Sequence, residues 1–183
     1  SLYSLPFEPG IGSNCKIHPS AIIDEGCKIG DDVIIGERVV IREPVWIGSE
    51  VIIEPGSIIG AEGILYRSAT DGNLLIPHAG YVRIHDKVSL MANSIVVRSI
   101  HDTDLTEIGQ GTIIGLNSIV GHEAKIGASV VISNQCVIAR RSIVGNNSFL
   151  GANVAVKEHV RIGKNSRVMT GSVVIRDVAE QSS

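Results

Sequence analysis

The stretch IGQGTIIGLNSIVGHEAKIG, residues 108–127, has an aliphatic residue at every sixth position and a glycine directly after each one. Four positions after the aliphatic residue stands a small one, as at Thr112, Ser118 and Ala124. No helix or ordinary strand repeats in sixes, whereas in a parallel β-helix each hexad forms one short strand and a turn. The stretch therefore predicts an all-β chain wound into stacked triangular coils of three hexads each.

The six-residue period extends over most of the chain. It holds from Ile84 to Val174 with one exception, Asp102. An earlier block has isoleucine at positions 17, 23, 29, 35, 41, 47, 53 and 59. We therefore predict a single domain over residues 1–183, with hexads at 17–64 and 84–179 and an inserted loop at 65–83.

The composition excludes several classes of protein. A net charge of −3 gives no electrostatic reason to bind nucleic acid. No apolar run reaches the roughly 18 residues of a membrane span, and the amino terminus lacks a charged-then-apolar secretion signal, so we expect a cytoplasmic protein. Cys27 and Cys136 fall at small interior positions and Cys15 precedes the first hexad, which predicts reduced, packed thiols rather than disulfides or a zinc site.

The repeat is interrupted between Ile59 and Ile84. These residues are 25 positions apart, one more than four hexads, so the phase slips and a segment must loop out. Residues 66–73 are polar and contain an Asp71-Gly72 turn signal. Two interpretations remain open: a tolerated surface insertion, or a binding segment that reaches over a neighbouring subunit or a substrate.

A milder irregularity surrounds Asp102, which stands where an aliphatic residue should point inward. Because an unpaired buried carboxylate is costly, we predict that the segment bulges outward or that a partner neutralises Asp102. An outward bulge would expose His101, Asp102 and Asp104 near the corner that carries His122 and form a polar pocket. The alternative is a solvated acidic turn.

Two non-repetitive stretches resemble the UDP-3-O-acylglucosamine N-acyltransferases among the hexapeptide-repeat acyltransferases. Residues 60–84 are similar to that family's glycine, aromatic and Ile-Pro loop, and residues 119–127 to the segment that bears its catalytic histidine. The pair His122-Glu123 is also similar to the His-acid pair of smaller bacterial N-acetyltransferases of nucleotide-linked amino sugars. The resemblance implies a left-handed helix and a homotrimer with active sites between subunits.

The resemblance also implies roles for individual residues. His122 matches the general base, with Glu123 orienting its ring, and an imidazole with an ordinary pKa of about 6.5 can accept a proton at neutral pH. His159 matches a substrate-side histidine. Tyr66 lies in the family's loop and is expected, with His101, Asp102 and Asp104, to bind substrate.

The donor is expected to be acyl-coenzyme A or an acyl carrier protein. One coil after His122 the family usually has a glycine whose amide polarises the thioester carbonyl; this chain has Arg140. Its backbone N–H remains available for that role. We expect Ala139, Arg140, Arg141 and Lys157 to bind the cofactor, the basic residues through its phosphates.

The function that this resemblance predicts is acyl transfer to the amine of a nucleotide-linked amino sugar. A sugar O-acetyltransferase is the alternative, and acidic residues such as Asp102 and Asp104 slightly favour an amine. A zinc-dependent γ-type carbonic anhydrase needs a second histidine five positions after the first, where Gly127 stands, so no metal is expected. A catalytically silent scaffold is the remaining possibility.

Overall fold

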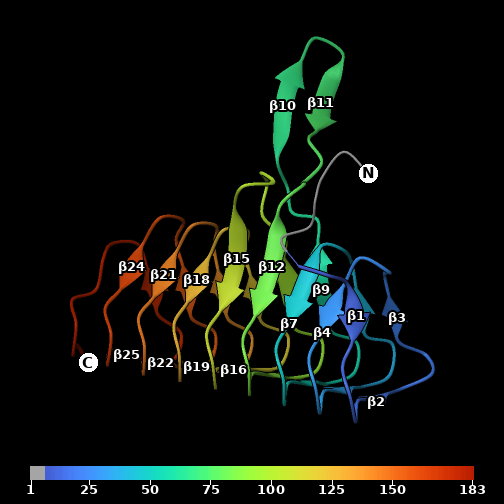
Figure 1. Ribbon diagram of the computed structural model, residues 1–183. Coiled ribbons are helices and arrows are strands. Elements are labelled where there is room, and N and C mark those ends of the chain that lie inside the picture. Colours follow the sequence, from blue (N-terminus) through green and yellow to red (C-terminus); the bar gives the residue numbers. More distant parts are fainter. Residues whose placement is uncertain (1–6) are drawn as a thin grey trace.

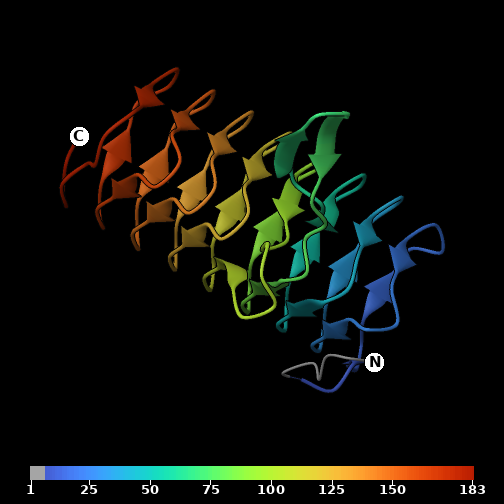
Figure 2. The ribbon, with the colours of Figure 1, turned by 90° about the horizontal axis from the view of Figure 1, so that it is seen from above.

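The computed structural model describes residues 7–183, so residues 1–6 of the predicted domain lie outside the described part. The chain forms a three-sided prism whose coils stack along one axis, with the first coils near one end and β24 (Arg161–Ile162) near the other (Figures 1 and 2). Each face is an eight-stranded sheet of parallel strands. The predicted parallel β-helix is confirmed.

The strands are short, mostly two residues each, and follow one another along the three faces in a fixed spatial order. The first face contains β1 (Gly10–Ile11), β4 (Lys28–Ile29), β7 (Val45–Ile47), β12 (Tyr81–Ile84), β15 (Leu105–Ile108), β18 (Lys125–Ile126), β21 (Ile143–Val144) and β24 (Arg161–Ile162). The second face contains β2 (Lys16–Ile17), β5 (Ile34–Ile35), β8 (Ile52–Ile53), β13 (Ser89–Leu90), β16 (Ile113–Ile114), β19 (Val131–Ile132), β22 (Phe149–Leu150) and β25 (Arg167–Val168). The third face contains β3 (Ile22–Ile23), β6 (Val40–Ile41), β9 (Ile58–Ala61), β14 (Ile95–Val97), β17 (Ile119–Val120), β20 (Val137–Ile138), β23 (Ala155–Val156) and β26 (Val173–Val174).

The core is a stack of aliphatic side chains at the inward position of each hexad. Ile108, Ile114 and Ile132 are completely buried, and the small residues four positions later, such as Thr112, are buried beside them. Burial of one such side chain contributes roughly 1.5–3 kcal/mol, so the repeated ladder supplies most of the stabilisation. Cys27 and Cys136 occupy buried places in this core, and all three cysteines are free.

The inserted segment forms a β-hairpin. Strands β10 (Tyr66–Ala69) and β11 (Gly72–Leu75) pair antiparallel and project away from the prism (Figure 1). The sheet resumes at Tyr81 rather than Ile84, because β12 pairs over more residues with β7 and β15 than the two-residue strands do. At the other end, β1 extends the prism ahead of residue 17 by pairing with β4.

Within the described residues, no helix is long and apolar enough to cross a membrane.

Candidate active site

The segment after β14 leaves the regular hexad path. Pairing between β14 and β9 shifts register at Val97, and the chain then turns outward before β15 begins at Leu105. Asp102 and its neighbour His101 are exposed, whereas Ser99 and Ile100 stay buried. The outward bulge predicted from Asp102 is therefore present, and it ends beside the corner that follows β17.

That corner, residues 121–124, connects β17 on the third face with β18 on the first. Because each coil takes 18 residues in this part of the prism, His122 is followed one coil later by Arg140 and then by Glu158. The backbone ties these coils together: Arg141 N–H donates to His122 O at 3.0 Å, and His159 N–H donates to Arg140 O at 3.1 Å. Coils in a stacked sheet lie roughly 4.8 Å apart, so substituents in one column reach the same ligand.

The next column along the corner contains Glu123, Arg141 and His159. Their φ angles are +61°, +56° and +63°, in the left-handed region. Substituents at two adjacent corner positions diverge, so His122 and Glu123 open on two different grooves.

The first groove has a volume of about 490 Å³ and opens beside the third face. Its walls are largely apolar and also include His122 and two charged residues; the lining residues are Gly63, Ile64, Val97, Gly121, His122, Val137, Ala139, Arg140 and Glu158. The groove therefore offers an apolar channel that leads to an imidazole.

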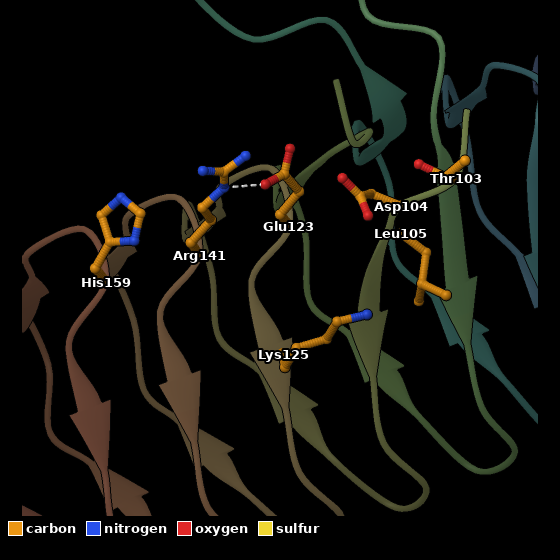
Figure 3. A pocket seen from close by; sticks show the side chains of 7 residues that line it. All are labelled: Thr103, Asp104, Leu105, Glu123, Lys125, Arg141 and His159. Carbon is orange, nitrogen blue, oxygen red and sulfur yellow. Dashed lines mark hydrogen bonds and ion pairs between the residues drawn. The ribbon is translucent and has the colours of Figure 1, made fainter. Parts of the chain in front are cut away.

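The second groove opens beside the first face and is polar (Figure 3). It is lined by Thr103, Asp104, Leu105, Glu123, Lys125, Arg141 and His159. Glu123 forms an ion pair with the Arg141 guanidinium, drawn as the dashed line in Figure 3. Asp104 lines the same groove and forms no ion pair among residues 7–183, so its carboxylate faces the groove without a direct cationic partner.

The His122 ring is held in place on several sides. It is only 7% exposed, and the edge of its ring packs against the ring of His78, with centroids 5.2 Å apart. Its Nδ1 atom is buried 3.8 Å from Glu123 Oε1, too far for a hydrogen bond, and neither atom has another partner in the described residues. Its Nε2 atom forms no hydrogen bond there and is not among the buried unpaired atoms, so we infer that Nε2 faces the apolar groove.

The electrostatic surroundings keep this imidazole neutral. Burial lowers the pKa of His122 below its usual value; Glu123 opposes that shift, and His78, Arg140 and Arg141 reinforce it. Burial raises the pKa of Glu123, but the hydrogen bond and positive charge of Arg141 outweigh burial, so the net shift is downward. At neutral pH the site therefore holds a neutral imidazole beside an ionised carboxylate.

The backbone N–H of Arg140 makes no hydrogen bond within residues 7–183. At two other corners, an asparagine one coil further on accepts the bond of the equivalent amide: Leu116 N–H donates to Asn134 Oδ1 and Ala128 N–H to Asn146 Oδ1, both at 3.0 Å. At Arg140 the corresponding residue is Glu158, and no such bond forms. A free amide thus lies one coil from His122.

The predicted site residues fall into three groups. His122, Ala139 and Arg140 line the apolar groove, and Glu123, Asp104, Arg141 and His159 line the polar groove.

The third group lies outside both grooves. Tyr66 is exposed on the hairpin, His101 and Asp102 are exposed on the bulge, and Lys157 is exposed after β23. Their roles, like those of the residues in the grooves, stay predictions.

Sequence reasoning missed three residues around His122, namely His78, Gly63 and Glu158. Glu158 could have been found by counting 18 residues from Arg140. Gly63 is the small residue four positions after Ile59, but the hexad count does not show that it faces His122; His78 could not be found because it lies in the inserted loop, where the period is lost. A side chain on Gly63 would approach His78 Cε1 to 2.8 Å and His122 Cδ2 to 3.5 Å, so glycine leaves space for both rings.

Comparison with known proteins agrees with the repeat pattern. The bacterial transferase hexapeptide (six repeats) family matches residues 8–43, 26–61 and 141–176. No curated protein sequence is similar enough to count as a match. Hexapeptide repeats of this kind therefore occur in both the first and the last part of the chain, and the fold is a left-handed parallel β-helix, as in the acyltransferase structures that it resembles.

Particular solved structures show the likeness in detail. The UDP-N-acetylglucosamine acyltransferase of Bacteroides fragilis is 26% identical, with a TM-score of 0.85 over 96% of this chain and 66% of that one. The enzyme described by the same name from Francisella novicida is 24% identical, with a TM-score of 0.69 over 89% of this chain and 62% of that one. The Arabidopsis UDP-N-acetylglucosamine acyltransferase is 21% identical, with a TM-score of 0.60 over 88% of this chain and 68% of that one. The chain thus spans slightly less than two thirds of the length of the first two proteins.

Proposed function

We propose that the chain is an acyltransferase that moves an acyl group from acyl-coenzyme A, or an acyl carrier protein, to the amine of a nucleotide-linked amino sugar. The observation that carries the proposal is the neutral imidazole of His122, which lines the apolar groove one coil from a free backbone amide and is followed by Glu123 in the polar groove. The likeness to an acyltransferase of a nucleotide sugar at 26% identity supports the class of reaction.

In the proposed mechanism, His122 is the general base. Its Nε2 accepts a proton from the acceptor while the acceptor nitrogen attacks the thioester carbonyl carbon. The Arg140 N–H donates to the developing oxyanion. The carbon–sulfur bond then breaks, and the protonated His122 returns the proton to the leaving thiolate, so the ring ends neutral.

Glu123 orients the base in this scheme. When its Oε1 accepts a hydrogen bond from Nδ1–H of His122, it fixes the tautomer in which the free lone pair lies on Nε2. A carboxylate has the same role beside the histidine of serine hydrolases. The 3.8 Å separation must shorten when substrate binds, and catalytic hydrogen bonds are often longer in the unliganded state.

The two grooves suit the two substrates. The apolar groove suits the pantetheine arm and acyl group, and the Arg140 side chain at its end can meet coenzyme A phosphates. The polar groove suits the sugar, where the Asp104 carboxylate can hold an ammonium group until it releases a proton to water; the neutral amine must then reach across the corner to His122 Nε2 in the apolar groove.

A homotrimer is part of the proposal. The outward positions of the second and third faces include exposed isoleucines, such as Ile34, Ile52 and Ile119, while the first face is mainly charged. The hairpin exposes Tyr66 and Leu75 side by side, and an isolated two-stranded hairpin is only marginally stable in water. Packing of these surfaces against neighbouring copies would bury them, and a monomer in sedimentation experiments would contradict it.

We also propose a cytoplasmic location, because acyl-coenzyme A and nucleotide sugars are made and used in the cytoplasm.

A sugar O-acyltransferase is the second candidate. The structure at 26% identity is described as acting on UDP-N-acetylglucosamine, a sugar whose nitrogen already carries an acyl group. Pairs of nucleotide sugars that differ only in an amine or a hydroxyl at the acceptor carbon distinguish the candidates. Asp104→Asn is expected to raise KM for the amine sugar and to leave the hydroxyl sugar unchanged.

Release of free thiol from acyl-coenzyme A in the presence of acceptor sugars tests the proposal. His122→Ala is expected to reduce the rate by about 10²–10⁴-fold, the usual contribution of a general base. His85→Ala is the matched control, because His85 bonds to Glu107 at 2.8 Å and lines neither groove. An undiminished rate in His122→Ala would show that this residue is not the general base, and would favour the alternative that the protein is a catalytically silent scaffold.

A further inference from the structure

A second imidazole, His78, lies against His122 in the interior of the site. His78 belongs to the segment between the hairpin and β12 and is 3% exposed. The two ring planes are 76° apart, so the edge of one ring meets the face of the other.

His78 is fixed by backbone groups on two neighbouring segments. Its Nδ1 lies 3.1 Å from Arg98 O and 3.3 Å from Gly63 N. Since one nitrogen either donates to the carbonyl or accepts from the amide, only one of these contacts is a hydrogen bond at a time. In both tautomers the ring therefore keeps one backbone hydrogen bond, either to Arg98 at the start of the bulge or to Gly63 just after β9.

Unpaired buried polar atoms gather around this ring. In residues 7–183 the buried side-chain atoms without a partner are His78 Nε2, Ser99 Oγ, His122 Nδ1 and Glu123 Oε1. Ser99 directly follows Arg98, whose carbonyl contacts His78. A core that served stability alone would place apolar atoms at these positions, because unpaired buried polar atoms destabilise a fold.

The geometry points to His78 as a positioning residue for His122: its ring packs at a steep angle against the base and shields it from water, and Glu123 Oε1, 3.8 Å away, is the acceptor within reach of Nδ1. This inference rests on the proposed role of His122. His78 touches neither of the two open grooves, so it acts through His122 rather than on substrate.

The charges around His122 agree with this role. Burial, to which His78 contributes by its contact, is the largest cause that lowers the pKa of His122. Glu123 raises that pKa, while His78, Arg140 and Arg141 lower it. Loss of the His78 ring would admit water and remove a lowering influence, so both changes would raise the pKa of His122.

An NMR titration of the His122 ring measures this directly, with its signal assigned by its absence in His122→Ala. In His78→Ala the titration midpoint of His122 is expected to rise by at least about half a pH unit, and kcat to fall on the order of tenfold with little change in KM because the base is misplaced. In His78→Phe the midpoint and kcat are expected to return most of the way, because an aromatic ring restores the shield. His85→Phe is the control, because His85 lines neither groove and does not contact His122 through an aromatic pair.

A His122 midpoint that does not move in folded His78→Ala overturns the inference, and so does a failure of His78→Phe to restore it. If His78→Ala does not fold, His78→Gln takes its place, since it removes the ring but keeps a polar side chain. The titration needs no acyl transfer. Full activity in His122→Ala would therefore reject the proposed function. The effect of the His78 variants on the titration of His122 could still be measured and judged independently.

Discussion

Substitution of Gly121 by alanine tests whether the Arg140 amide stabilises the oxyanion. A methyl group on Gly121 would lie 2.9 Å from Arg140 N, 2.9 Å from Ile138 O and 3.0 Å from Ala139 C. These are backbone atoms that cannot swing aside, so the methyl covers the free N–H or pushes it away from the carbonyl that it is proposed to polarise.

The cost in stability is expected to be small. Ala139 occupies the equivalent position one coil later, so this corner geometry accepts a methyl group after a slight adjustment. Overpacking of this kind costs about 1 kcal/mol at the low end of its range, which lowers Tm by about 2–4 °C in a chain of this size. Loss of an oxyanion donor lowers kcat by about 10²–10³-fold.

The assay is kcat for thiol release together with Tm from thermal unfolding. Gly115→Ala is the matched control, because its methyl would lie 2.5 Å from Ser133 C at a corner away from both grooves. We expect this control to lose at least as much stability and to keep kcat. Full kcat in Gly121→Ala would refute the assignment of the Arg140 amide.

Three further outcomes are expected. The rate of acyl transfer should fall as the pH decreases through the lowered pKa of His122. Arg141→Ala should move this fall to higher pH, because loss of the cation raises the pKa of both His122 and Glu123. A pH–rate profile of the variant checks the shift. Burial raises the pKa of the Cys27 thiol to about 12, and burial also raises that of Cys136, so Ellman's reagent should modify the half-buried Cys15 first and reach the other two only on unfolding. Ile132→Ala should destabilise the prism by roughly 2–5 kcal/mol, because Ile132 is completely buried, and denaturant unfolding measures that loss.

The hexad count predicted the fold because every coil repeats the same local arrangement. Ile108, Ile114 and Ile132 point inward as their spacing requires, and the misfit of Asp102 located the bulge. Counting in steps of 18 also connects His122 with Arg140. The neighbours of the base from outside the period were not accessible in this way.

His78 shows why the rest was hidden. It follows a hairpin whose direction depends on turn geometry and on the backbone contacts with Arg98 and Gly63, none of which a spacing rule describes. The separation of His122 and Glu123 into two grooves likewise depends on side-chain directions at a corner. Periodicity predicts which column a residue occupies, but tertiary contacts decide what it faces.

The left-handed backbone at positions 123, 141 and 159 puts three residues of the proposed sugar groove at corner positions that other residues would hold with less strain. Asparagine tolerates that conformation better than glutamate, arginine or histidine, and Asn117, Asn147, Asn153 and Asn165 already hold comparable corners. A redesign that places a consensus residue of the repeat at every corner would therefore substitute asparagine at all three positions. The product is expected to melt later than the natural protein, and its polar groove would lose the Glu123 carboxylate, the Arg141 guanidinium and the His159 imidazole and keep only Asp104 and Lys125 as charged groups.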